Sequence, residues 1–67
     1  MKTVSGKRFA KVLEDHGWTL ERIIRHHIYK SPDGLKTIAV PVHNNADLKV
    51  GILSSFLKQA RLTEADL

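Results

Sequence analysis

The first stretch of the chain places apolar side chains three and four residues apart, with lysines and an arginine between them. This spacing is typical of a helix with one apolar side. Ser5 is a residue type that caps helix starts, and Gly17 is of the type that most often follows a helix end. The pattern predicts a helix over residues 6–16, whose apolar side carries Phe9, Val12, Leu13 and His16.

After Gly17 the apolar period changes to two, which is typical of extended strands. Residues 18–25 are predicted to form a first strand and residues 26–30 a second. In the first strand, one side is expected to carry Trp18, Leu20, Arg22 and Ile24. The "SPDG" segment, residues 31–34, has the proline and glycine of a tight turn. An antiparallel hairpin should therefore connect the second strand to a third.

The third predicted strand lies within "LKTIAVPV", residues 35–42. Ile38, Val40 and Val42 share one face, and Pro41 must lie at the strand end or on an edge because proline has no amide hydrogen to donate. After a polar turn over residues 43–48, the helical period returns from Leu48 to Ala60. Thr63 and Asp66 form a weak helix-start signal near the end of the chain.

The order helix, three strands, helix defines an α+β fold, and residues 1–67 are expected to form a single domain. Two helices with one apolar side each can cover one face of a three-stranded antiparallel sheet. The other face of the sheet would then be open to solvent or to a ligand.

Composition narrows the possible functions. The chain has no cysteine, so it has no thiolate for zinc binding or nucleophilic attack. Residues 1–11 contain no apolar run that resembles a signal peptide or a membrane span, so a cytoplasmic protein without a membrane partner is expected. Eleven Lys and Arg against seven Asp and Glu give a net charge of +4, which favours polyanions such as RNA.

Three segments carry a family resemblance. They are "SGKRFAKVLEDHGW" at 5–18, "HHIYKSPDG" at 26–34 and "VPVHNNADLKVGILSSFLKQARLT" at 40–63. In this order and spacing, they resemble the HicA family of toxin-type mRNA interferases. The resemblance covers almost the whole chain and implies a double-stranded-RNA-binding-like fold. It also implies mRNA as substrate and a HicB-type antitoxin as partner.

The resemblance implies that one histidine, in a Gly-Ser-His motif at the start of the second strand, cleaves RNA without a metal or cofactor. That histidine corresponds to His26. Ile24 and Arg25 stand where the family has glycine and serine, so the preceding turn must be shaped differently, because isoleucine disfavours positive φ. In the second helix, Val50 replaces a common proline, and Arg61 replaces a common glycine after the last turn.

Histidine suits a metal-independent ribonuclease, because a pKa of about 6.5 keeps both protonation states available. His26 is predicted to take the proton of the ribose 2′-hydroxyl. The predicted nucleic-acid contacts, close in sequence or across the turn, are Arg25, His27, Lys30 and Lys36. Adjacent strand residues face opposite ways, so only one of the two histidines faces the helices, and the sequence leaves open which. His27 remains an alternative catalytic or assisting residue.

Other candidate residues are expected to have structural roles. His16 should bond the last carbonyls of the first helix, and His43 should lie in the loop before the second. Trp18 and Phe56 are core candidates, while Tyr29 suits either the core or a base-stacking surface. A metal site built from His26, His27 and His43 is disfavoured because adjacent strand residues point apart.

Three functions are compatible with these features. The first is a toxin ribonuclease held inactive by its antitoxin. The second is a non-catalytic RNA-binding or antitoxin-docking domain on the same fold, which the Ile24-Arg25 replacement favours. The third is a basic domain that binds only protein.

Overall fold

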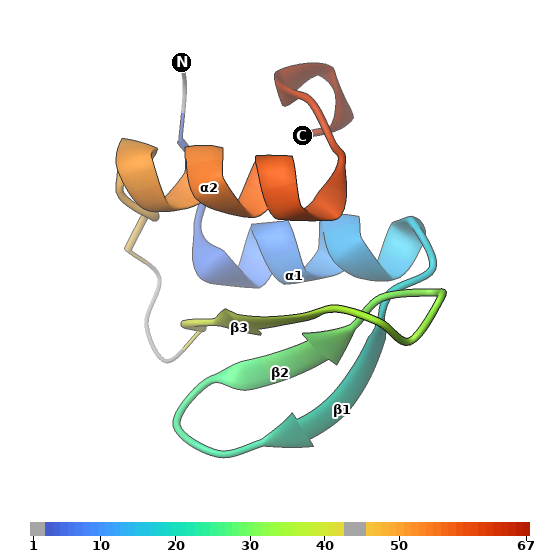
Figure 1. The fold of residues 1–67 in the computed structure, drawn as a ribbon. Coiled ribbons are helices and arrows are strands. Elements are labelled where there is room, and N and C mark those ends of the chain that lie inside the picture. The colour runs from blue at the N-terminus through green and yellow to red at the C-terminus, as the bar shows by residue number, and fades with distance from the viewer. Residues whose placement is uncertain (1–2, 43–45) are drawn as a thin grey trace.

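Two helices lie on one face of a three-stranded antiparallel sheet in the computed structural model (Figure 1). The structure describes residues 3–42 and 46–67. The predicted α+β architecture and its element order are confirmed. The elements are α1 (Gly6–Asp15), β1 (Thr19–Ile23), β2 (His27–Lys30), β3 (Thr37–Val40), α2 (Val50–Ala60) and the short 3₁₀ helix η1 (Glu64–Asp66).

Helix α1 begins and ends as its sequence predicts, with the last residue shifted by one. The Ser5 hydroxyl oxygen accepts a 3.1 Å hydrogen bond from the amide of Arg8. Gly17 has a φ of 90°, and the amide of Trp18 donates across it to the carbonyl of Leu13 at 2.9 Å. This pairing is the Schellman motif, in which a left-handed residue reverses the chain after a helix.

The sheet has the order β1-β2-β3, and its helix-facing side is defined by the pairing of β2 with β3. Tyr29 pairs with Ile38 and His27 with Val40, and all but His27 are buried. Ile28 and Lys30, at the alternate positions of β2, therefore lie on the open face. Strand β1 is exposed along its whole length, so the helices cover mainly β2 and β3.

The predicted regular alternation of the first strand is wrong. Leu20 pairs with Tyr29, but Arg22 rather than Glu21 pairs with Ile28, so β1 has an irregularity of the bulge type at Glu21. Ile23 then pairs with His27. The extra residue moves Arg22 from the side that carries Leu20 to the open face.

The predicted second strand starts one residue too early, because His26 belongs to the turn between β1 and β2. This turn consists of Ile24, Arg25 and His26, and the Ile24 amide donates to the His26 carbonyl at 3.1 Å. None of the three has positive φ. The turn thus forms without the glycine that the family resemblance implies at its first position.

The second helix also begins later than predicted. Leu48 is 6% exposed and lies in the core, but it precedes α2, and its amide donates to the carbonyl of Val4 at 2.8 Å. An isolated bridge between Ser5 and Asp47 fixes this segment beside the start of α1. Pro41 follows the last residue of β3, as its missing amide hydrogen predicts.

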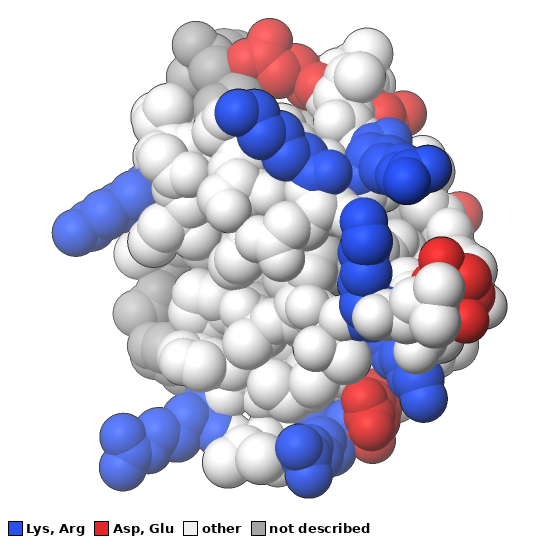
Figure 2. Space-filling model, in the orientation of Figure 1, with Lys and Arg blue, Asp and Glu red and all other residues white. Residues whose placement is uncertain are grey.

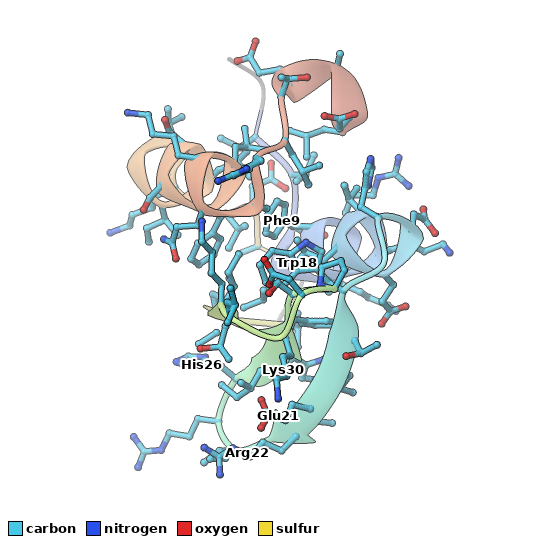
Figure 3. All side chains as sticks on the ribbon, turned by 45° about the vertical axis from the view of Figure 1, so that its right-hand side comes forward. Phe9, Trp18, Glu21, Arg22, His26 and Lys30 are labelled. Atoms are coloured by element: carbon cyan, nitrogen blue, oxygen red, sulfur yellow. The ribbon has the colours of Figure 1, made fainter. Side chains whose placement is uncertain are left out.

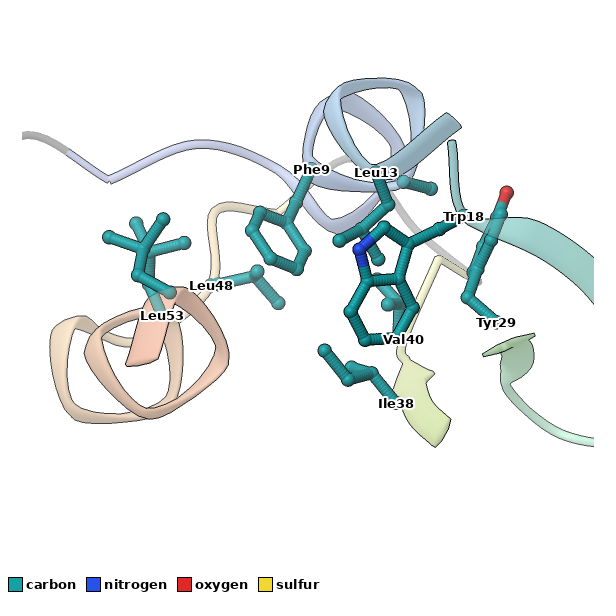
Figure 4. Close-up of a cluster of buried hydrophobic side chains, with 10 residues drawn as sticks. Phe9, Leu13, Trp18, Tyr29, Ile38, Val40, Leu48 and Leu53 are labelled. Carbon is teal, nitrogen blue, oxygen red and sulfur yellow. The ribbon is translucent and has the colours of Figure 1, made fainter. Parts of the chain in front are cut away.

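The core lies between the helices and the sheet (Figure 4). Phe9 of α1 stacks on Phe56 of α2, with ring centroids 5.5 Å apart. Trp18, just after α1, is 5% exposed. The predicted core roles of Trp18 and Phe56 are confirmed, although Phe56 is only partly buried. In a chain of 67 residues this small core is the main source of stability.

Candidate functional site

The two adjacent histidines occupy different positions. His26 lies in the β1–β2 turn and is partly exposed. His27 is the first residue of β2 on the helix-facing side, where its ring centroid lies 6.5 Å from that of Tyr29. The fold therefore settles which histidine faces the helices. His27 packs at the edge of the core, while His26 lies at the end of the hairpin.

The open face of the sheet carries charged side chains. Figure 3 shows Glu21, Arg22 and Lys30 on the side of the sheet turned away from the helices, with His26 to their left. Arg22 pairs with Ile28 in the register, and both Arg22 and Lys30 are exposed. Arg22 is not among the residues that sequence reasoning selects, because strict alternation places it on the helix side.

The predicted cationic residues do not gather at one point. Arg25 directly precedes His26 in the turn and is exposed. Of the predicted cations, it is the nearest in sequence to His26. Lys30 is the last residue of β2, and Lys36 follows the next turn. At about 3.3 Å per residue, β2 separates Lys30 from the histidine turn by roughly 13 Å. Lys36 lies beyond it, at the opposite end of the sheet.

Tyr29 belongs to the core rather than to a base-stacking surface. It is 2% exposed, and its hydroxyl donates a 2.7 Å hydrogen bond to a carboxylate oxygen of Glu14. Burial and then this hydrogen bond to Glu14 raise the pKa of Tyr29 to about 12. The phenol therefore stays neutral at physiological pH.

His16 has the structural role that its position predicts. Its Nδ1 lies 2.8 Å from the carbonyl oxygen of Val12, and because a carbonyl only accepts, Nδ1 carries the hydrogen. Its Nε2 lies 3.6 Å from a carboxylate oxygen of Asp66. The amide of Thr63, followed by its hydroxyl and by His16, lowers the pKa of the Asp66 carboxyl.

Metal binding finds no support in the residues that the structure describes. Among them, no three His, Asp or Glu side chains converge as metal ligands would. His43, the third member of the disfavoured histidine site, lies outside the described residues.

No helix in the ranges 3–42 and 46–67 is long and apolar enough to cross a membrane.

Charge is distributed unevenly over the surface. Figure 2 shows most Lys and Arg side chains around the rim of one face, with a largely neutral centre. Two exposed apolar residues, Ile23 and Ile24, lie beside His26 and are 63% and 59% exposed. The end of the hairpin thus combines a histidine, an arginine and an apolar pair, which is suited to contact both an anion and a protein.

A three-stranded sheet with two helices on one face and basic residues on the other defines a small α+β domain. A family model described as HicA toxin of bacterial toxin-antitoxin matches residues 6–62, and the chain belongs to this family. No curated protein and no solved structure matched in the other two comparisons. Family membership places the chain in a toxin–antitoxin system.

Proposed function

We propose that this chain is a metal-independent endoribonuclease that cleaves mRNA, with His26 as its general base. The observation that carries the proposal is the position of His26. It is partly exposed, lies in a turn rather than within the core, and has the exposed Arg25 beside it. A partly exposed imidazole next to a cation is what a metal-free phosphodiester cleavage needs.

In the proposed reaction, His26 removes the proton from a ribose 2′-hydroxyl, and the 2′-oxygen attacks the adjacent phosphorus. The new bond closes a 2′,3′-cyclic phosphate, and the bond from phosphorus to the 5′-oxygen breaks. The leaving 5′-oxygen takes a proton from water or from a lysine. The Arg25 guanidinium stabilises the extra negative charge on the phosphate oxygens. Arg22 and Lys30 contact the RNA backbone farther along the open face.

We further propose that a HicB-type antitoxin holds the enzyme inactive in the cytoplasm by covering the β1–β2 turn. Ile23 and Ile24 support this proposal because they are large, apolar and exposed on either side of the strand end. Apolar side chains of this kind are characteristic of protein contacts. A partner that covers them would also cover His26.

The test is cleavage of an mRNA by the purified chain in the presence of a chelator. His26→Ala should lower the cleavage rate by about 100- to 10,000-fold, which is the usual contribution of a general base. His27→Ala, which changes the same residue type on the helix side, should have a much smaller effect. Thermal unfolding of both variants checks that they are folded. If His26→Ala cleaves as fast as the parent, the assignment of the base is wrong.

A second candidate is a non-catalytic domain that binds RNA or docks the antitoxin. It is favoured by Ile24 and Arg25, which replace the glycine and serine that the family resemblance places before the histidine. Under this alternative, a gel shift would retain RNA in a salt-dependent manner, while the RNA stayed intact. Binding without cleavage would therefore reject the enzyme and keep the RNA-binding surface.

A further inference from the structure

A pocket lies at the end of the molecule opposite the histidine turn. It has a volume of about 290 Å³ and lies between the β2–β3 turn and the C-terminal end of α2. Trp18 and Pro32 contribute apolar walls, while Lys36 and Arg61 contribute cations from two different elements. In Figure 1, both helices end on this side, at the right, and the histidine turn lies at the lower left.

The residue that follows α2 is unusual for its conformation. Arg61 has a φ of 57°, and among the described residues it alone combines positive φ with a side chain. The amide of Leu62 donates to the carbonyl of Leu57 at 2.9 Å, and the amide of Arg61 donates to the carbonyl of Lys58 at 3.2 Å. This is the same Schellman motif that ends α1, where the left-handed residue is Gly17.

The two helix ends form a comparison within one molecule. Both use the same pair of backbone hydrogen bonds, and glycine serves that geometry with least strain. The backbone therefore gives no reason for an arginine at position 61. Non-glycine residues held in such conformations cluster at active sites and ligand-binding sites. The side chain of Arg61, which lines the pocket, therefore explains why an arginine occupies this position.

Lys36 and Arg61 outnumber the one carboxylate of the pocket lining, Asp33, on which the charge of Lys36 also acts. Within residues 3–42 and 46–67, neither Lys36 nor Arg61 forms an ion pair with a carboxylate. Asp33 also lines the pocket, but it accepts hydrogen bonds from the hydroxyl of Ser31 and from the amide of Leu35. Figure 2 shows several Lys and Arg side chains along the right-hand side, where the helices end, with Asp and Glu side chains among them.

We propose that Lys36 and Arg61 bind a backbone phosphate of the RNA, several nucleotides away from the bond that is cut. This inference rests on the proposed function, because it assumes that RNA occupies the histidine turn. From His26 to Ser31 the chain rises about 16 Å, at 3.3 Å per residue. A stacked single strand covers that distance in about five nucleotides. The pocket would thus fix the direction in which RNA lies across the protein.

The experiment measures binding of 2′-O-methyl RNA, which lacks the attacking hydroxyl and so cannot be cleaved by the proposed route. Fluorescence anisotropy compares a trinucleotide with a decanucleotide. Arg61→Gly should weaken binding of the decanucleotide about three- to fivefold and leave the trinucleotide unaffected. It should also reduce the slope of log affinity against log salt by about 0.7. Arg61→Lys, which keeps the charge, should restore most of the affinity.

Stability separates this role from a purely structural one. Arg61→Gly removes the left-handed strain, so it should raise the melting temperature by about 4 °C while weakening RNA binding. If Arg61 acted only by compensating the helix dipole, Arg61→Gly would raise the melting temperature by less than this, or lower it, and would leave RNA binding unchanged. Lys7→Ala, at the start of α1, is the matched control for loss of one charge. Its effect on RNA affinity should be the same for the trinucleotide and the decanucleotide.

The outcomes distinguish the two proposals. If the parent protein binds neither oligonucleotide at low salt, RNA binding and hence the proposed function fail. If the parent binds RNA but Arg61→Gly reduces affinity equally for both lengths, or not at all, the pocket does not hold a phosphate of the RNA. In the second case, an acidic protein segment becomes the better occupant, and the inference is overturned while the proposed function stands.

Discussion

The hydroxyl of Tyr29 and the carboxylate of Glu14 are joined by a 2.7 Å hydrogen bond that connects the central strand to α1. The two residues are 15 positions apart in the sequence, and the strand β1 lies between them. Since Tyr29 is almost fully buried, the bond also satisfies the one polar group of its ring.

Tyr29→Phe should lower the free energy of unfolding by about 1 kcal/mol at pH 7, because it removes this hydrogen bond. The effect should depend on pH. The pKa of Tyr29 is raised to about 12 in the folded chain, above its ordinary value of 10. The stabilisation is thus complete below pH 10 and is lost as the pH rises towards 12. Urea unfolding, followed by Trp18 fluorescence at pH 7 and pH 11.5, measures the free energy of unfolding of both proteins. If Tyr29→Phe lowered this free energy equally at both pH values, the pH dependence assigned to Tyr29 would be wrong.

Gly6 lies where the start of α1 meets the end of β3. A β-carbon at this position would lie 1.8 Å from the carbonyl oxygen of Pro41. Gly6→Ala should therefore destabilise the fold by about 2 kcal/mol or more, because backbone must move. Gly51→Ala is the matched control. No atom lies within 4 Å of its β-carbon, and alanine should stabilise α2 by about 0.5 kcal/mol. Chemical denaturation of both variants tests the difference.

Asp33 organises the turn between β2 and β3. The hydroxyl of Ser31, followed by the amide of Leu35, lowers the pKa of the Asp33 carboxyl. A depressed pKa means that the folded chain favours the carboxylate, so stability is present above about pH 4 and decreases as the pH falls further. Asp33→Asn should weaken the decrease in melting temperature that occurs as the pH falls below about 4. If the melting temperatures of both proteins decreased in parallel, the stability of the turn would not depend on the charge of Asp33.

Arg25 is the cation nearest in sequence to the proposed base. Arg25→Ala should slow mRNA cleavage about tenfold and lower the salt dependence of RNA binding by about 0.7 in logarithmic slope. Lys49→Ala removes one charge just before α2 and should change the cleavage rate little. Single-turnover cleavage and anisotropy measure the two effects. If Lys49→Ala has the same effect as Arg25→Ala, net charge rather than position determines the rate.

The sequence predicts those elements whose signals are local. The spacing of Phe9 and Leu13, with Ser5 and Gly17 at the ends, is sufficient for α1, because caps and period agree. The alternation of Ile38 and Val40 is likewise sufficient for β3. Leu48 shows the limit of this reasoning. It continues the apolar period of α2 without being helical, because a buried residue in a loop serves the core equally well.

The candidate site is predicted only in part for a similar reason. His26 follows from the family resemblance, and its exposure follows from the turn. The position of Arg22 depends on one unpaired residue in β1, which alternation does not reveal. The separation of Lys36 from Arg25 depends on the direction of β2 between the two turns. Both are properties of the assembled sheet rather than of any short segment.

The irregularity at Glu21 lets β1 carry one extra residue, while Arg22 lies opposite Ile28 on the open face. Deleting Glu21 would restore regular alternation and leave Arg22 opposite Ile28 on that face, because Leu20 and Arg22 would then be adjacent residues of the strand. Relatives whose first strand is one residue shorter should therefore carry the equivalent basic residue one place closer to the tryptophan and on the same open face. An alignment gap in this strand would mark the loss of the bulge, not a reorientation of charge.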